Sequence, residues 1–267
     1  MKENMKNKTK ISFVKLQSTG NDFILFDLQK QKLPDNFISL IPQICDRHLG
    51  IGADGILLID KNNSYPFKMT FYNADGSKGK FCGNGSRALV KYAFENNLCS
   101  KKGTFIADDG IHDFNIDNES IEVSISAKTD FTKFQFENEL HYLYKIGVNH
   151  FVIPTENVEN FNVVKRGKYL HDHQKYKKIN PNFNFIKQIS DSKIKIRTYE
   201  NGVNDETLSC ATGSIASSIF ANSFFNMEYP IVAISEGGNI IIDKRENKFW
   251  LKGKTEITYN GEYFYDK

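Results

Sequence analysis

Two cysteines in matching sequence frames are the residues of this chain best suited to chemistry. Residues 82–88 read CGNGSRA and residues 210–216 read CATGSIA, so both follow the pattern Cys-x-x-Gly-Ser-x-Ala. Each frame leads directly into an apolar segment of helical length. Small residues leave backbone N–H groups uncovered, and the start of a helix directs these donors to one point. Such a site binds an anion, for example a substrate carboxylate, and it favours a thiolate.

A pair of thiols at two such sites predicts the inversion of a stereocentre. A free thiol has a pKa of about 8.5, which a helix N-terminus or a cationic neighbour lowers to roughly 3.5–7.5. One cysteine can then be the base as a thiolate, while the other is the acid as a thiol. Placed on opposite faces of one carbon, Cys82 and Cys210 would remove a proton from one face and supply one to the other. The N–H donors would stabilise the enolate charge, so the reaction needs no metal and no cofactor.

Other interpretations of the cysteines remain open. Cys45 and Cys99 lack flanking glycines, and we interpret them as small buried hydrophobic residues. A disulfide between Cys82 and Cys210 would be an inactive form of a facing pair. A nucleophilic-cysteine hydrolase would need one cysteine with a positioned histidine such as His150, but this leaves the second cysteine frame unexplained.

Several polar residues near predicted strand ends are candidate partners of the thiols and of a substrate. We expect His150 and Glu200 to tune the pKa values of the thiols by charge and hydrogen bonding, although either could be a surface residue. Four asparagines could bind the amino and carboxyl groups of a substrate, and they are Asn21, Asn73, Asn182 and Asn201. Asparagine is also common in turns, so the residue type alone does not decide.

A repeat of domain length accounts for the two cysteine frames. Cys82 and Cys210 lie 128 residues apart, and the same shift superimposes other similar segments. The matched segments are 21–25 on 149–153, 56–58 on 184–186, 71–73 on 199–201, and 107–110 on 235–238. We therefore predict two homologous domains, residues 1–128 and 129–255, with residues 256–267 returning to complete the first.

The elements around each cysteine predict an α/β (α+β) fold. Apolar spacing predicts a helix over Phe37 to Cys45, and strands over 56–59 and 67–72. Helices are expected over 86–97 and 214–225, each followed by strands with a hairpin signal. We expect each domain to wrap a curved, mainly antiparallel sheet around one central helix, with the active site in the cleft between the domains.

Composition excludes several classes of protein. The 267 residues are 40% hydrophobic with a formal net charge of +3, and no long basic face alternates with aromatic residues, so we expect no nucleic-acid partner. Residues 1–10 lack the apolar core of a signal peptide, and no apolar run reaches the length of a membrane span, so we expect a cytoplasmic protein with no membrane partner. No cysteine pair has the spacing of a zinc site, and we predict no metal.

An ordered set of motifs along the chain resembles the diaminopimelate epimerase family. The motifs are Thr19–Phe23 (TGNDF), 46–55 (DRHLGIGADG), 73–76 (NADG), 82–85 (CGNG), 197–200 (RTYE) and 206–210 (ETLSC). The resemblance extends from Phe13 to Phe264. It implies a cofactor-independent isomerase with two pseudo-symmetric domains, usually a homodimer, that interconverts LL- and meso-diaminopimelate on the route to lysine and peptidoglycan.

The resemblance also implies roles for particular residues. Cys82 and Cys210 would be the acid and base, with His150 and Glu200 beside them. The pairs Gly83-Asn84 and Ala211-Thr212 would hold the carboxylate at the reacting centre. The substrate contacts would be Asn21, Asn73, Asn182 and Glu200.

Three positions depart from the family pattern. Asn201 stands where the family usually has an arginine that pairs with the distal carboxylate, and an amide cannot supply a bidentate cation. Asn149 replaces the proline that usually precedes His150, and Ala211 replaces a glycine. The first departure motivates two alternatives to the epimerase, a cofactor-independent racemase of another amino acid and a catalytically impaired relative that only binds.

Overall fold

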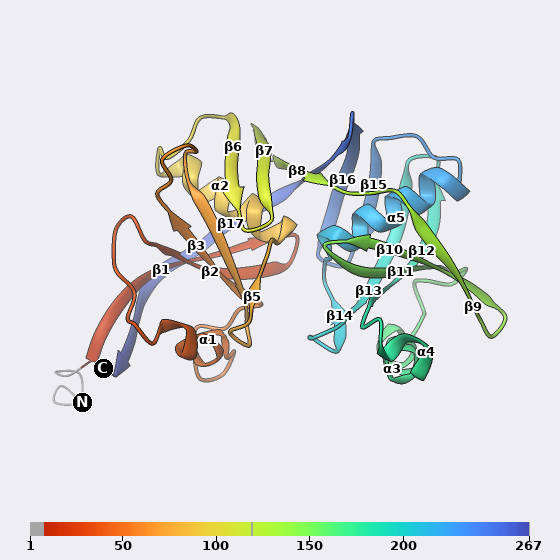
Figure 1. Cartoon of the computed structure of the whole chain (residues 1–267), viewed down its shortest axis with the longest axis horizontal. Helices are drawn as coiled ribbons and strands as arrows, with labels where there is room; N and C mark the ends of the chain where they lie inside the picture. Colours follow the sequence, from red (N-terminus) through yellow and green to blue (C-terminus); the bar gives the residue numbers. More distant parts are fainter. Residues whose placement is uncertain (1–7, 119, 267) are drawn as a thin grey trace. The chain divides into compact units, whose positions relative to one another are not determined.

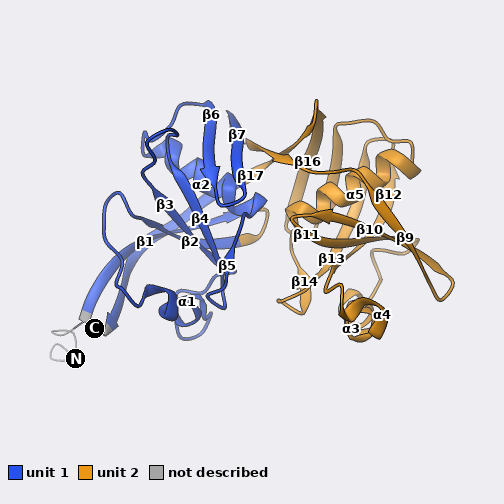
Figure 2. Ribbon diagram, viewed as in Figure 1, with its two compact units in different colours: residues 1–18, 22–119, 255–267 blue, residues 19–21, 120–254 orange. Residues whose placement is uncertain are grey.

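The computed structural model describes residues 8–118 and 120–266 of the chain, which divides into two compact units (Figures 1 and 2). The described residues do not include 1–7, 119 and 267. These residues belong to the predicted domains, and residues 1–7 belong to the polar N-terminal segment. Unit 1 comprises residues 1–18, 22–119 and 255–267, and unit 2 comprises residues 19–21 and 120–254.

Unit 1 contains the first cysteine frame. Its elements are β1 (Lys8–Ser18), β2 (Asn21–Asp27), α1 (Phe37–Cys45), β3 (Gly55–Asp60), β4 (Lys68–Asn73), β5 (Lys78–Gly79), α2 (Gly83–Glu95), β6 (Lys102–Ala107), β7 (Gly110–Asp117) and the end of β17 (Lys248–Asp266). Strand β2 pairs with β1 and, in parallel, with β3, and β3 pairs antiparallel with β4. Helix α2 packs on β1, β3 and β4, and α1 covers a separate apolar cluster that includes Ile24, Phe26 and Ile41.

Unit 2 contains the second cysteine frame. Its elements are β8 (Ser120–Ser126), β9 (Phe131–Phe136), β10 (Glu139–Ile146), β11 (Val148–Pro154), α3 (Val163–Asp172), α4 (Gln174–Lys177), β12 (Asn182–Ser190), β13 (Lys193–Glu200), β14 (Asp205–Thr207), α5 (Ala211–Phe224), β15 (Ile231–Ser235), β16 (Gly238–Arg245) and the start of β17. Helix α5 packs on β10 to β13 and on β15 and β16. Its sequence is apolar or small on nearly every side, which suits a helix buried on most faces.

Corresponding strands of the two units follow the 128-residue shift. In unit 1 the parallel pair β2 and β3 places Phe23 opposite Gly55, and in unit 2 the pair β11 and β12 places Phe151 opposite Phe183. The predicted α/β class with two pseudo-symmetric, strand-rich domains is confirmed.

One strand pair deviates from the shift by two residues. Asn73 of β4 lies opposite Gly55, whereas Tyr199 of β13 lies opposite Phe183. Asn73 and Asn201 match in the sequence repeat, but they do not occupy equivalent positions in the two strand ladders. The reason is that the connection before β13 is shorter than the connection before β4.

Strand β17 serves both units in turn. Its residues 248–254 pair with β8 in unit 2, and its residues 255–266 pair with β1 in unit 1. The predicted boundary after residue 128 leaves β8 in the first domain, whereas β8 belongs to unit 2 because its whole length pairs with this part of β17.

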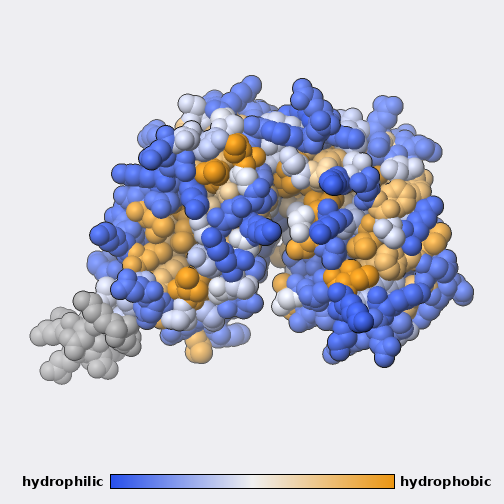
Figure 3. Space-filling model, in the orientation of Figure 1, coloured by the Kyte–Doolittle hydropathy of each residue, from blue (hydrophilic) through white to orange (hydrophobic). Residues whose placement is uncertain are grey.

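Hydrophilic residues cover most of the face drawn in Figure 3, with smaller hydrophobic patches on both units. None of the helices in the described part of the chain combines the length and the apolar character that are needed to cross a bilayer.

Candidate active site

Cys82 is the N-cap residue of α2, so its side chain lies where the helix presents its first amide groups. Its backbone is extended (φ −137°, ψ 116°), and its Sγ accepts a hydrogen bond from the amide of Gly85 at 3.4 Å. The helix begins at Gly83 rather than at Ser86 as predicted, which places Gly83 and Asn84 in its first turn. A Cβ at position 85 would lie 2.9 Å from Leu57 Cδ2, so a larger residue would require the Leu57 side chain to shift.

A buried guanidinium lies directly behind this turn. Arg87 is fully buried, and its Nη2 donates to Asn84 Oδ1 at 2.6 Å while its Nε donates to Ser18 Oγ at 3.1 Å. Its Nη1 donates to the carbonyl of Gly83 at 3.4 Å. Arg87 therefore fixes the two residues that follow Cys82.

Cys210 has the same place at the start of α5. It is the N-cap residue, with φ −120° and ψ 110°, and Ala211 and Thr212 form the first turn. A Cβ on Gly213 would lie 2.2 Å from Asn184 Oδ1 and 3.2 Å from Cys210 Sγ. Glycine at this position thus allows Asn184 to approach the helix start closely.

Within unit 2, a series of buried and partly buried polar side chains leads from Cys210 to Thr198. Cys210 Sγ lies 3.8 Å from Thr212 Oγ1, which lies 2.9 Å from His150 Nε2. His150 Nδ1 lies 3.4 Å from Asn184 Nδ2, and Asn184 Oδ1 accepts a hydrogen bond from Thr198 at 3.0 Å. Asn184 also donates to the carbonyl of Phe151 at 3.0 Å, which fixes its orientation.

His150 is neutral in this environment. Desolvation lowers the pKa of His150 to about 3, and a hydrogen bond to the backbone of Ile146 opposes this only in part. His150 was predicted to tune the pKa of a thiol by its charge or by hydrogen bonding. A neutral imidazole cannot act by charge near neutral pH, so it can act only by hydrogen bonding through Thr212.

The other predicted contacts of unit 2 meet at the end of β13. Asn182 is buried and its Oδ1 accepts from the amide of Asn201 at 2.9 Å, while Asn201 Oδ1 lies 3.2 Å from His171 Nε2. Glu200 accepts a hydrogen bond from Thr207 at 3.0 Å. These contacts hold the chain around Glu200 and Asn201 in one conformation.

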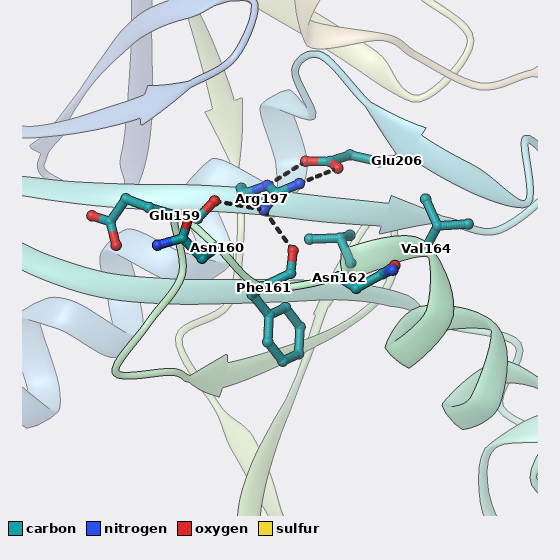
Figure 4. Close-up of a pocket in the computed structure, with 8 residues that line it drawn as sticks. Glu159, Asn160, Phe161, Asn162, Val164, Arg197 and Glu206 are labelled. Carbon is teal, nitrogen blue, oxygen red and sulfur yellow. Dashed lines mark hydrogen bonds and ion pairs between the residues drawn. The ribbon is translucent and has the colours of Figure 1, made fainter.

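Arg197 fixes the hairpin that carries Glu200. It forms a bidentate pair with Glu206, at 2.7 Å from Nε and 2.6 Å from Nη2, and Nη1 donates to the carbonyl of Phe161 at 2.7 Å (Figure 4). These groups line a surface pocket of about 360 Å³ beside the start of α3. The two motif residues Arg197 and Glu206 thus join β13 to β14 and to the loop before α3.

Asn73 and Asn21 have different surroundings. Asn73 is exposed at the end of β4, and its Nδ2 donates to Ser77 Oγ at 2.9 Å within the following turn. Asn21 belongs to unit 2, because the segment 19–21 packs there. Thr19 Oγ1 lies 3.0 Å from Ser209 Oγ, next to Cys210, and Gly20 has a positive φ of 82° against Leu208.

The structure thus gathers ten of the twelve predicted residues in two groups, one in each unit, and Asn21 and Asn73 belong to neither group by the contacts described above. Cys82, Gly83 and Asn84 share the start of α2, and the group of unit 2 consists of Cys210, Ala211, Thr212, His150, Asn182, Glu200 and Asn201. Asn184 and Arg87 were not predicted as site residues. The available signal was a polar residue at a buried position of a strand or helix pattern, since both side chains are fully buried.

Cys45 and Cys99 lie outside the two helix starts that carry Cys82 and Cys210. None of the four cysteines forms a disulfide bond in the structure. Burial raises the pKa of Cys45 to about 12 and the pKa of Cys99 to about 11, so both stay protonated thiols. Within the described residues, no group of three or more His, Cys, Asp or Glu side chains is arranged to hold a metal ion.

Comparison with known proteins identifies the family. A family model described as diaminopimelate epimerase matches residues 13–129. A diaminopimelate epimerase of Flavobacterium psychrophilum is 38% identical over 92% of this chain and 97% of its own length. One from Aquifex aeolicus is 35% identical over 94% of this chain and 97% of its own length. The chain belongs to the diaminopimelate epimerase family.

Solved structures share the fold of this family member at low sequence identity. A PhzF-family phenazine biosynthesis protein from Enterococcus faecalis has a TM-score of 0.74 at 12% identity, over 95% of this chain and 99% of that one. A hydroxyproline epimerase from Agrobacterium vitis, solved with bound trans-4-hydroxy-L-proline, has a TM-score of 0.72 at 11% identity, over 98% and 94%. The fold thus occurs in a hydroxyproline epimerase as well. Membership of the diaminopimelate epimerase family makes this chain an isomerase.

Proposed function

We propose that this protein interconverts LL- and meso-2,6-diaminopimelate by proton transfer between the substrate Cα and the thiols of Cys82 and Cys210. The observation that carries the proposal is the placement of both cysteines as N-cap residues of corresponding helices in two pseudo-symmetric units. Family membership over most of the chain supports the same reaction. An amino acid is accordingly its substrate.

The proposed reaction needs no reactant other than the substrate and the two cysteines. One cysteine thiolate accepts the α-proton, and the electron pair of the C–H bond becomes the enolate of the substrate carboxylate. The other cysteine thiol gives its proton to the opposite face of the carbon and is left as a thiolate. The reaction requires both sulfur atoms to reach one carbon. It involves no net oxidation or reduction, and the two thiols and the first-turn amides would carry it without a cofactor.

We assign the remaining roles from the surroundings of each residue. The first-turn amides of Gly83-Asn84 and Ala211-Thr212 would stabilise the enolate, since the start of a helix directs N–H donors to one point. His150 would act on Cys210 through Thr212, with which it shares a hydrogen bond. Glu200 would complete the acid–base group, and the substrate contacts would be Asn21, Asn73, Asn182 and Asn201.

Asn201 is the contact on which substrate choice depends most. Its amide carries no charge, so any cation for the distal carboxylate of diaminopimelate must come from another residue. A racemase of a different amino acid would show turnover on its own substrate and none on LL-diaminopimelate. Adding the arginine by Asn201→Arg should improve the KM for diaminopimelate if this position faces the distal end.

The reaction is tested by exchange of the substrate α-proton in deuterated water. Wild-type protein with LL-diaminopimelate should incorporate deuterium and form the meso isomer. Cys82→Ala and Cys210→Ala should each abolish epimerisation, because inversion needs both thiols. Cys99→Ala removes a thiol outside both frames and keeps a small apolar side chain there, so the rate of epimerisation should stay close to that of the wild type. Absence of turnover on diaminopimelate by the folded wild type would refute the assignment.

We further propose that the protein acts as a homodimer in the cytoplasm. The family resemblance motivates the dimer, and four free cysteines suit a reducing compartment. Light scattering of the purified protein should give twice the mass of one chain.

A further inference from the structure

Asn201 is followed by a glycine, which is a reactive setting for an asparagine. The backbone amide of the next residue can attack the side-chain carbon of an asparagine, and glycine leaves that amide uncovered because it has no Cβ. The chain contains this dipeptide three times, at residues 84–85, 201–202 and 260–261. The surroundings of each dipeptide therefore decide where the reaction can occur.

The first dipeptide lies inside helix α2. Asn84 and Gly85 are both buried, and the Gly85 amide donates to Cys82 Sγ at 3.4 Å. Attack by this amide would require the first turn of the helix to open. We therefore expect Asn84 to react slowly, because local opening of packed structure costs free energy.

The third dipeptide lies in the ladder between β17 and β1. Asn260 pairs with Val14 and Gly261 pairs with Phe13, so the backbone of both residues is held in the strand. A Cβ on Gly261 would lie 2.9 Å from the Phe13 ring, which shows that the ring packs against this glycine. The reaction needs the backbone to rotate, and strand pairing opposes this rotation.

The second dipeptide lies in the loop 201–204 between β13 and β14. Gly202 is exposed and has a positive φ of 92°, and an added Cβ would meet no atom within 4 Å. The loop is closed by the Asn204 amide, which donates to the carbonyl of Glu200 at 2.8 Å. The turn therefore favours glycine at this position and leaves it open to water.

The contacts of Asn201 do not engage the groups that would react. Its backbone amide donates to Asn182 Oδ1 at 2.9 Å, and its Oδ1 accepts from His171 Nε2 at 3.2 Å. Among the described residues, none accepts a hydrogen bond from Asn201 Nδ2 or from the Gly202 amide. The attacking nitrogen and the leaving nitrogen are thus both free, while the oxygen on the carbon between them is held.

We propose that Asn201-Gly202 is a site of spontaneous deamidation, which converts the neutral amide at position 201 into a carboxylate. Solvent base removes the proton of the Gly202 amide, and the nitrogen forms a bond to Cγ of Asn201. The bond between Cγ and Nδ2 then breaks, and ammonia leaves with a proton from water. Water opens the resulting five-membered succinimide at either carbonyl and gives aspartate or isoaspartate. The net change is the gain of water and the loss of ammonia, with no oxidation.

Deamidation adds one negative charge beside Glu200 at the end of β13. Isoaspartate also places a side-chain carbon in the backbone and lengthens the loop 201–204. Asn201 is a proposed substrate contact, and diaminopimelate has a carboxylate at each end, so either product should weaken substrate binding by repulsion between like charges. This effect on binding rests on the proposed function, whereas the deamidation does not.

The deamidation is tested on the folded, full-length protein without substrate. The protein is incubated at neutral and at alkaline pH, and the peptides with the three dipeptides are followed by mass spectrometry for the replacement of NH2 by OH. Asn201 should react roughly tenfold or more faster than Asn84 and Asn260, because only these two require packed structure to open. The rate should rise with pH, because the reaction begins with loss of the amide proton.

Two variants and an unfolded sample serve as controls. Asn201→Gln keeps the amide but would need a six-membered ring, so its peptide should stay unchanged while the wild type reacts. Asn260→Gln is the matched control, because it removes a dipeptide in the ladder and should leave the rate at Asn201 unchanged. In urea the three dipeptides of the wild type should react at similar rates, because no structure protects any of them.

Two results would overturn the inference. One is a folded wild type in which Asn201 reacts no faster than Asn84 and Asn260. The other is an equal preference for Asn201 in urea, which would place the cause in the neighbouring sequence and not in the fold.

The effect on binding has a separate measurement. The deamidated form is separated from the intact protein on an ion-exchange column by its added negative charge, and its KM for LL-diaminopimelate should be several-fold higher. An unchanged KM would refute the effect on binding. Deamidation of Asn201 in a protein without turnover of diaminopimelate would support the modification site and refute the proposed function.

Discussion

At the scale of single residues, the polar side chains behind Cys210 restrict one another. Asn184 uses its amide group toward Phe151 and His150 and its oxygen toward Thr198, and Gly213 has no Cβ because Asn184 occupies that space. His150 consequently sits in a fixed, dry environment in which the neutral imidazole is favoured.

The buried His150 should make folding stability depend on pH. The folded chain holds the pKa of His150 near 3, below its ordinary value of 6.5, so between these values the unfolded chain binds a proton that the folded chain does not. Stability should therefore rise with pH through this window, by up to about 1.4 kcal/mol per pH unit for one proton. Urea unfolding of wild type and His150→Asn, measured between about pH 5 and 6.5, should give the shallower slope for the variant. Parallel slopes would show that this imidazole is protonated in the folded protein.

The sequence predicted the residues that carry local signals and missed those that depend on packing. The cysteines, His150 and Thr212 stand in or beside recognisable frames. Asn184 falls where the repeat matches it to Ile56, so its polar role follows only from the space at Gly213. The neutral state of His150 could not be predicted either, because it results from desolvation by strands that are distant in the sequence.

At the scale of elements, an ion-pair network anchors β2 to the loop before β3. Asp22 accepts hydrogen bonds from Lys15 at 2.6 Å and from Arg47 at 2.7 and 3.0 Å, and Arg47 also reaches Asp54 at 2.8 Å. Lys15 further donates to the carbonyl of Gly52. The motif residues 46–55 thus have a structural role in unit 1, where they fix the residue that follows Asn21.

Removal of the Asp22 charge should destabilise unit 1. Burial raises the pKa of Asp22, but the hydrogen bonds and charges of Arg47 and Lys15 outweigh it and lower the pKa to about 2. The stabilisation is therefore present above the ordinary value of 3.8 and is lost as the pH falls toward about 2. Asp22→Asn leaves the buried Lys15 without this carboxylate, which should cost on the order of 3 kcal/mol in urea unfolding at neutral pH.

The matched control for this prediction is Asp54→Asn. The Asp54 side chain is 44% exposed, and its partner Arg47 is 56% exposed, so this surface pair should contribute under about 1 kcal/mol. Equal losses for the two variants would mean that the burial of Lys15 and Asp22 has no energetic consequence.

The sequence predicted the bounds of a helix correctly where a periodic apolar pattern ended in a clear signal. The helix predicted over Phe37 to Cys45 is α1 with the same bounds, because its apolar residues are spaced on one face. Helix α2 instead starts three residues before the predicted Ser86, since its first turn consists of Gly83, Asn84 and Gly85, which have low helix propensity and are held by tertiary contacts. Nothing in the sequence indicated the two-residue change in the β13 register. Differences in the lengths of successive loops cancel, so the shift between the two cysteines is still 128 residues.

At the scale of the whole molecule, the shared strand β17 is the feature that the repeat alone does not produce. Residues 255–266 lie along all of β1, and Tyr263 and Tyr265 pack on the cluster that contains Ile11 and Phe13. The repeat predicted that the chain returns to its first half at this point. It did not predict the assignment of β8 to unit 2, which depends on pairing between residues that are distant in the sequence.

A chain that ends at Lys254 should lose the stability of unit 1 selectively. Its β1 would lack the antiparallel partner and the two tyrosines, so Ile11 and Phe13 would be exposed. Hydrogen exchange followed by mass spectrometry should show faster exchange in β1, which then keeps β2 but not β17 as a partner, while peptides of β11 and β12 in unit 2 stay protected. A chain that ends at Asp266 is the control, and unchanged protection of β1 in the shorter chain would contradict the prediction.

The late position of β17 also has a consequence during synthesis on the ribosome. Unit 1 receives its final strand only after residues 255–266 have been made, and unit 2 needs residues 248–254 to cover β8, so both units stay incomplete until β17 has been synthesised. At bacterial or eukaryotic elongation rates the nascent chain would wait roughly 10–50 s in this state. Throughout that time one edge of β1 offers unpaired backbone groups, which is a surface that can pair with another chain and aggregate.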